Sequence, residues 1–179
     1  FGTYDNFTLT VNGTLTVTGN ITQQNDPNFY QYTVLAGTGT IICGSFTLGD
    51  VTKPSSGSGV VINVSSQVNQ LTINGNLTLN SVGNATNDGI AYPYFSLDAN
   101  KLTLGGQIIT ASISNPLSGG VGVAAYPGLG LFQMDSGAAN TTLELTNASP
   151  IVTPITTNFT IDFTNNGAGT GTVLYDAAS

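Results

Sequence analysis

Apolar and polar residues alternate through the first 22 residues of the chain. Between Asn6 and Thr22, Asn or Thr fills every even position, and the odd positions are apolar or Gly. Strict alternation places all apolar side chains on one face of an extended strand. The six residues of this face are Phe7, Leu9, Val11, Leu15, Val17 and Ile21. At about 3.3 Å per residue, residues 7–21 would span about 50 Å, well beyond an ordinary strand of about five or six residues.

Asn12-Gly13 offers a competing interpretation, because this dipeptide is the strongest short hairpin signal. A two-residue hairpin would place Val11 opposite Thr14, and Leu9 opposite Thr16. Opposed residues share a face, so each face of the hairpin would mix apolar and hydroxyl side chains. The pattern therefore favours a single extended strand over residues 7–21.

The rest of the chain consists of short strand-like runs separated by turn sequences rich in Gly, Pro and Asn, with almost no helical spacing. Many short strands joined by such turns are typical of an antiparallel sandwich. We therefore expect an all-β protein: an antiparallel Ig-like or pilin-like β-sandwich over residues 23–179, preceded by an extended N-terminal donor strand of residues 1–22.

An internal echo keeps a second architecture open. Residues 9–17 read LTVNGTLTV and residues 71–79 read LTINGNLTL, and residues 102–106 carry a weaker copy, LTLGG. Such phrases also occur in β-solenoids, whose repeats stack to bury a continuous core. No constant period of about 20 to 30 residues runs through the chain, so we interpret the similarity as two long strands with the same two-faced pattern, and the solenoid is the alternative to the sandwich.

Composition excludes several function classes. Lys53 and Lys101 are the only basic residues, and the net charge is −7. A nucleic-acid partner is excluded because binding to phosphates needs a basic patch. No apolar run approaches the roughly 18 residues of a membrane span. Cys43 is the single cysteine, and its apolar surroundings predict a small buried hydrophobe.

The candidate chemistry is sparse. The chain has no His, and its nine carboxylates are scattered without close pairs. General acid–base catalysis near neutrality usually relies on His or on paired carboxylates. Zinc-type ligand spacing and calcium-loop spacing are also missing. We therefore predict no enzyme activity, no cofactor and no metal site.

Glycan acceptor motifs are in excess. About four Asn-x-Ser/Thr motifs would be expected by chance from the Asn, Ser and Thr content. The chain carries nine, at Asn6, Asn12, Asn20, Asn63, Asn76, Asn84, Asn140, Asn147 and Asn158. The chain also begins at Phe1 rather than Met, which is typical of a protein exported after removal of a signal peptide. An extracellular protein with N-linked glycans is the expectation.

The leading strand suggests how such a protein could assemble. A β-sandwich that lacks one strand exposes an apolar groove, and an extended strand from a neighbour can fill it. Because donor and groove lie on the same chain, the contact is heterologous and propagates a fibre of identical subunits. The six apolar residues of the leading strand would form this interface.

On these features, with residues 6–22 carrying the likeness, the chain resembles the thread pilins of thermoacidophilic archaea. Those glycosylated subunits join head to tail by donor-strand complementation, with an architecture similar to bacterial chaperone-usher pilins. The resemblance implies an extracellular filament on the cell surface that serves adhesion or biofilm contacts, and no cofactor.

The alternative function is a monomeric cell-surface domain that binds carbohydrate or belongs to a surface layer or adhesin. Its ligand platform would be aromatic. Four tyrosines alternate in two pairs that could form one: Tyr30, Tyr32, Tyr92 and Tyr94.

Overall fold

The computed structural model describes residues 4–24, 30–49, 61–83, 90–98, 100–113, 130–134, 140–151, 159–162 and 171–177. Within these ranges the regular elements are β-strands, and no helix is present. In chain order the strands are β1 (Tyr4–Thr10), β2 (Thr14–Gln23), β3 (Tyr30–Ala36), β4 (Thr40–Leu48), β5 (Val61–Ser66), β6 (Gln70–Ile73), β7 (Leu77–Gly83), β8 (Ile90–Leu97), β9 (Asn100–Leu104), β10 (Ile108–Ile113), β11 (Gly130–Met134), β12 (Thr141–Leu145), β13 (Phe159–Asp162) and β14 (Gly171–Tyr175).

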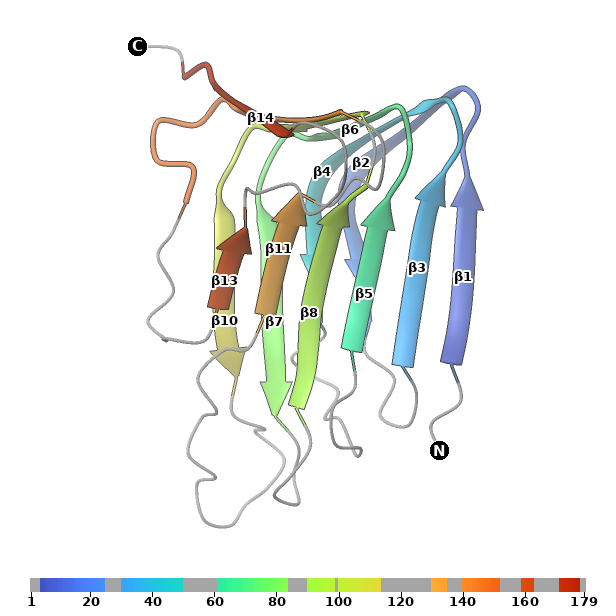
Figure 1. The fold of residues 1–179 in the computed structure, drawn as a ribbon, viewed down its shortest axis with the longest axis vertical. Helices are drawn as coiled ribbons and strands as arrows, with labels where there is room; N and C mark the ends of the chain where they lie inside the picture. Colours follow the sequence, from blue (N-terminus) through green and yellow to red (C-terminus); the bar gives the residue numbers. More distant parts are fainter. Residues whose placement is uncertain are drawn as a thin grey trace.

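Nearly all strand pairing is parallel. Sheet A contains β1, β3, β5, β8, β11 and β13 side by side, all pointing the same way (Figure 1). Sheet B contains β2, β4, β6, β7, β9, β10, β12 and β14, and its pairings are parallel too. Among the described strands, the exception is a two-residue antiparallel contact between β7 and β8, which links the two sheets.

The chain winds as a stack of coils. Each coil crosses sheet A, turns into sheet B, and returns to sheet A beside its previous passage. Sheet B curls, as β4 shows: it pairs with β6 through Thr40–Cys43 and with β7 through Phe46–Leu48. This is a parallel β-solenoid, the alternative that the sequence left open.

The antiparallel Ig-like or pilin-like β-sandwich is therefore wrong. Alternation reports that a strand has one buried face, but it does not report the direction of the neighbouring strand. Coil lengths also hide the repeat. The aligned residues Leu9, Leu35, Ser66 and Leu97 are separated by 26, 31 and 31 residues, and Met134 follows 37 residues later.

The single strand expected over residues 7–21 is also wrong, and so is the hairpin. β1 ends at Thr10 and pairs with β3, whereas β2 begins at Thr14 and pairs with β4 in the other sheet. Between them, the Val11 N–H donates to the Ala36 carbonyl over 2.8 Å, and the Gly13 carbonyl accepts from the Thr40 N–H over 2.8 Å. The alternation continues across this corner because both strands turn their odd positions towards the same interior.

The core consists of columns of apolar side chains, with one residue from each coil. One column on sheet B follows the register from Leu15 through Ile41, Leu71, Leu102 and Leu143 to Val173. The next column runs through Val17, Cys43, Ile73, Leu104, Leu145 and Tyr175. The inner members are buried, and the members at the two ends are not. Within sheet B, apolar side chains of successive coils thus stack on one another, which removes apolar surface from water.

Glycines at the corners allow one coil to lie directly on the next. A Cβ added to Gly106 would lie 2.3 Å from the carbonyl group of Gly75, and a Cβ on Gly75 would lie 2.7 Å from the Gly44 carbonyl oxygen. The same column continues to Gly19 in the first coil, where an added Cβ would meet nothing within 4 Å. At Gly75 and Gly106 the main chain of the neighbouring coil thus leaves no room for a side chain, whereas at Gly19 the space is open.

We predict that Gly106→Ala lowers the free energy of unfolding by about 1–3 kcal/mol, because its methyl group must displace the main chain of the coil below. Gly19→Ala is the matched control at the open end of the same column, with an expected change within about 0.5 kcal/mol. Urea titration of both variants measures the difference. Equal stability of the two would contradict this account of corner packing.

Candidate functional site: the open ends and the polar outer face

The six residues predicted as a donor-strand interface lie in the first coil and face their own chain. Val11 is buried at the corner, and four others pack against the core from β1 and β2: Leu9, Leu15, Val17 and Ile21. Phe7 on β1 is the exception, at 59% exposure. The division into residues 1–22 and 23–179 stays a prediction, although residues 4–23 pair with β3 and β4 of the same chain.

The N-terminal end of the solenoid is open. In the described part of the chain, β1 pairs only with β3, and β2 only with β4. A hollow of about 270 Å³ lies there, lined by Asn6, Phe7, Gln23, Gln31 and Thr33. The Gln23 amide donates to Gln31 Oε1 over 2.9 Å and accepts from Thr33 Oγ1 over 2.7 Å. This end thus presents the exposed aromatic side chain of Phe7 beside the Gln23 and Gln31 amides, which are hydrogen-bonded to each other.

The C-terminal end of sheet B is open as well. Within the described residues, β14 pairs on one side only, with β12. All five of its residues are exposed, including Val173 at 42% and Tyr175 at 60%. In the previous coil, Leu143 and Leu145 at the same register positions are buried. Among the described residues, the exposure of β14 therefore goes with the lack of a paired strand on its outer side and not with a different pattern of residues.

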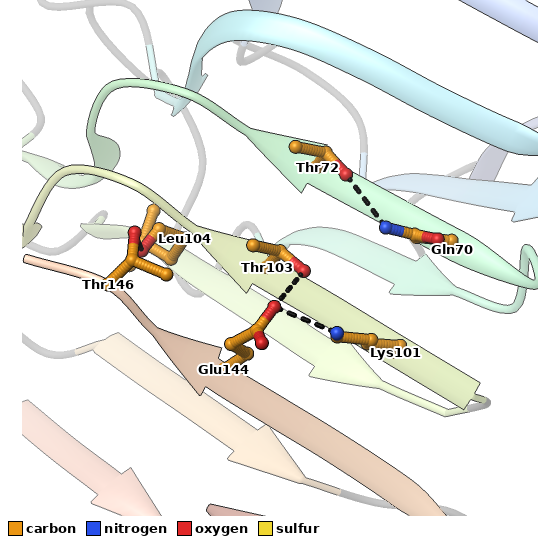
Figure 2. Close-up of polar contacts among 7 residues, drawn as sticks. All are labelled: Gln70, Thr72, Lys101, Thr103, Leu104, Glu144 and Thr146. Atoms are coloured by element: carbon orange, nitrogen blue, oxygen red, sulfur yellow. Dashed lines mark hydrogen bonds and ion pairs between the residues drawn. The ribbon is translucent and has the colours of Figure 1, made fainter. Parts of the chain in front are cut away.

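The outer face of sheet B carries a polar ladder that crosses coils (Figure 2). Glu144 on β12 accepts from Lys101 Nζ over 2.8 Å and from Thr103 Oγ1 over 2.8 Å, both on β9. The hydrogen bond from Lys101, followed by the one from Thr103, lowers the pKa of the Glu144 carboxyl. Glu144 occupies an outward register position opposite Thr103, so this ion pair ties two neighbouring coils together.

A second polar cluster lies on sheet A. Asp98, just after β8, accepts hydrogen bonds from the hydroxyls of Ser65 and Ser96, and the Gln67 amide donates to Ser65 Oγ over 3.0 Å. Ser65 and Ser96 are neighbours in register on β5 and β8. Sequence reasoning missed both clusters, because the partners that join different coils lie 33 to 43 residues apart and only the coil register brings them together.

The predicted glycan acceptors fall on different parts of the coils. Asn6, Asn12, Asn20 and Asn140 are exposed. Asn76 and Asn147 lie half-buried at corners, where the Asn76 side chain accepts from the Gln107 N–H over 2.9 Å and the Asn147 side chain accepts from the Ser149 N–H over 2.8 Å. Asn63 lies on β5, and its side chain is outside the described residues, as are Asn84 and Asn158 altogether. Glycosylation at these positions stays a prediction.

The tyrosine platform is only partly described. Tyr32 on β3 and Tyr94 on β8 are half-buried and share one register column, with Asn63 between them and Asn6 at its end. The Tyr94 hydroxyl donates to Gln133 on β11. The side chains of Tyr30 and Tyr92 lie outside the described residues.

Cys43 matches the expected role of a small buried hydrophobe, since it is fully buried in the core and burial raises the pKa of its thiol to about 11. Over the described ranges, no group of three or more metal-binding side chains comes together. No helix in the described part of the chain is long and apolar enough to cross a membrane.

Comparison with protein-family models, with curated proteins and with solved structures finds no match for this chain.

Two adjacent serines on β5 provide a test of the polar interior. Ser66 Oγ is buried without a hydrogen-bond partner, whereas Ser65 Oγ donates to Asp98. Ser66→Ala should raise the free energy of unfolding by up to about 1 kcal/mol, since it removes an unsatisfied buried hydroxyl. Ser65→Ala should lower that free energy by about 1 kcal/mol or more. Chemical denaturation of both variants gives the comparison, and two changes of the same sign would refute the assignment.

The Glu144–Lys101 pair predicts a small dependence of stability on pH. The pKa of Glu144 is lowered in the folded chain, so its contribution is present above the unfolded pKa and is lost as the pH falls through the folded pKa. An exposed pair contributes at most about 1 kcal/mol, or about 2–4 °C in Tm. Glu144→Gln should therefore melt slightly lower than the parent chain at pH 7 and at the same temperature at pH 2. A deficit that persists at pH 2 would contradict this origin.

Proposed function

We propose that this chain is a structural subunit of an extracellular fibre, in which identical chains associate head to tail through the open ends of the solenoid. The observation that carries the proposal is the exposure of the last member of each apolar column on sheet B. Val173 and Tyr175 are exposed at one end, and Leu15 and Val17 are half-buried at the other, while the members between them are buried.

Physical reasoning supports association over isolation. Stacked repeats need polar terminal caps to remain soluble as single molecules. A free strand edge beside exposed apolar side chains is a template for pairing with another chain. Residues 171–175 contain no charged residue and no proline, the usual protections of an edge strand.

Head-to-tail contact through two different ends is heterologous, and it extends into a fibre when successive copies continue along the stacking direction instead of closing into a ring. Insertion of the leading strand into a neighbour is not required, because β1 and β2 already pair with β3 and β4. The likeness to archaeal thread pilins thus concerns the kind of assembly proposed, an exported filament with adhesive contacts, and not the route of assembly.

The exposed acceptors Asn6, Asn12, Asn20 and Asn140 support the extracellular part of the proposal. Glycans at these positions would not disturb the core. They would also help to keep a chain with only 6% charged residues in solution.

A monomeric surface domain is the second candidate. The register column that brings Tyr32 and Tyr94 into line favours it, since aromatic side chains on one face of a sheet suit a carbohydrate ligand. This candidate predicts binding without self-association, and the fibre proposal predicts self-association without a ligand.

Sedimentation velocity over a hundredfold range of concentration tests the fibre proposal, with negative-stain electron microscopy of the largest species. We expect species that grow with concentration and appear as unbranched fibres. Val173→Asp should weaken association at least tenfold, because it places a carboxylate in the end contact. Thr78→Asp, on the outer face of β7 in a middle coil, should leave association unchanged. A parent chain that stays monomeric throughout would overturn the proposal.

A further inference from the structure

We infer that β14 of one copy pairs in parallel with the first half of β2 of the next copy, so that Leu174 lies beside Thr16 across the contact. This inference rests on the proposed function and specifies its interface. Both strands belong to sheet B. They are the first and the last strand of one continuous series of parallel pairings, which runs β2, β4, β6, β9, β12, β14.

The register within the chain fixes the register between copies. One outward column of sheet B runs, one residue per coil, through Thr16, Ile42, Thr72, Thr103, Glu144 and Leu174. Continuing this column by one strand spacing places Thr16 of the next copy after Leu174. The inward columns continue at the same time, so that Leu15 follows Val173 and Val17 follows Tyr175.

Side-chain chemistry agrees with this register. At the inward positions, apolar residues meet apolar residues, as they do at every coil boundary in these two columns of sheet B. At the outward positions, Thr14 follows Thr172, and Thr16 follows Leu174. Neither residues 14–17 nor residues 171–175 contain a charge, so no like charges face each other.

An irregularity in β2 limits the contact to its first half. The pairing of β2 with β4 shifts register between Val17 and Asn20. Such a bulge leaves a residue unpaired and bends the strand. Residues 14–17, before the irregularity, are therefore the part of β2 that offers β14 a regular ladder.

Engineered cysteines can report this register. Neighbouring strands lie about 4.7–4.9 Å apart, which suits a disulfide between directly opposed residues. Thr16 and Leu174 of the same chain are separated by five strand spacings, roughly 24 Å, so they cannot join within one molecule. Cys43 is left in place because it is fully buried.

The double variant Thr16→Cys/Leu174→Cys should form a ladder of covalent multimers on a non-reducing gel after mild oxidation. The control Thr16→Cys/Thr172→Cys is two residues out of register, with Cα atoms roughly 8 Å apart, and should cross-link at least tenfold less. Thr16→Cys alone reports head-to-head pairing of two β2 edges and should give no covalent dimer.

The outcomes separate this inference from the proposed function. If the parent chain forms fibres but the two double variants cross-link equally, or Thr16→Cys alone forms the main product, the register is overturned while the fibre stands. If folded, associating Thr16→Cys/Leu174→Cys gives no covalent multimers, the β14–β2 contact is likewise overturned. A parent chain that remains monomeric overturns both.

Discussion

Parallel stacking of each coil on the previous one is the contact on which the rest of this fold depends. It aligns the main-chain hydrogen bonds of both sheets, and it places equivalent side chains in columns such as Leu71, Leu102 and Leu143. The corners between the sheets must also lie one strand spacing apart from coil to coil. Glycine is therefore needed at Gly75 and Gly106, where an added Cβ would meet the main chain of the neighbouring coil, and not at Gly19, where the space is open.

Much of the local structure could be predicted from the sequence, but the topology could not. Alternation identified the inward residues of β1 and β2 and the buried environment of Cys43. It could not show that Asn12-Gly13 is a corner between two sheets, because odd positions point inwards on both sides. The weaker similarity, of residues 71–79 to 102–106, marked true register neighbours, Leu71 and Leu102. The stronger one, of residues 9–17 to 71–79, did not, because Leu9 lies in sheet A and Leu71 in sheet B. Segments of unequal length between coils concealed the period.

The same limit applies to the candidate sites. Lys101 and Glu144, or Ser65 and Asp98, are unremarkable in sequence because tens of residues separate them. The open ends were also invisible, since exposure at Val173 depends on the position of β14 in the stack and not on its composition. A pattern of residues describes what a strand needs from a neighbour, whereas only the fold shows whether that neighbour is present.

The uniform columns have a consequence for folding. Because β6, β9 and β12 present nearly the same inward pair (Leu71/Ile73, Leu102/Leu104 and Leu143/Leu145), a strand that docked one whole coil out of place would lose little apolar contact. The free-energy difference between the correct order of coils and an order in which one coil is skipped then depends on features that do not repeat from coil to coil. The Lys101–Glu144 ion pair is one, since it can form only when β9 and β12 are direct neighbours. A weak surface interaction therefore helps to specify the order in which the coils stack.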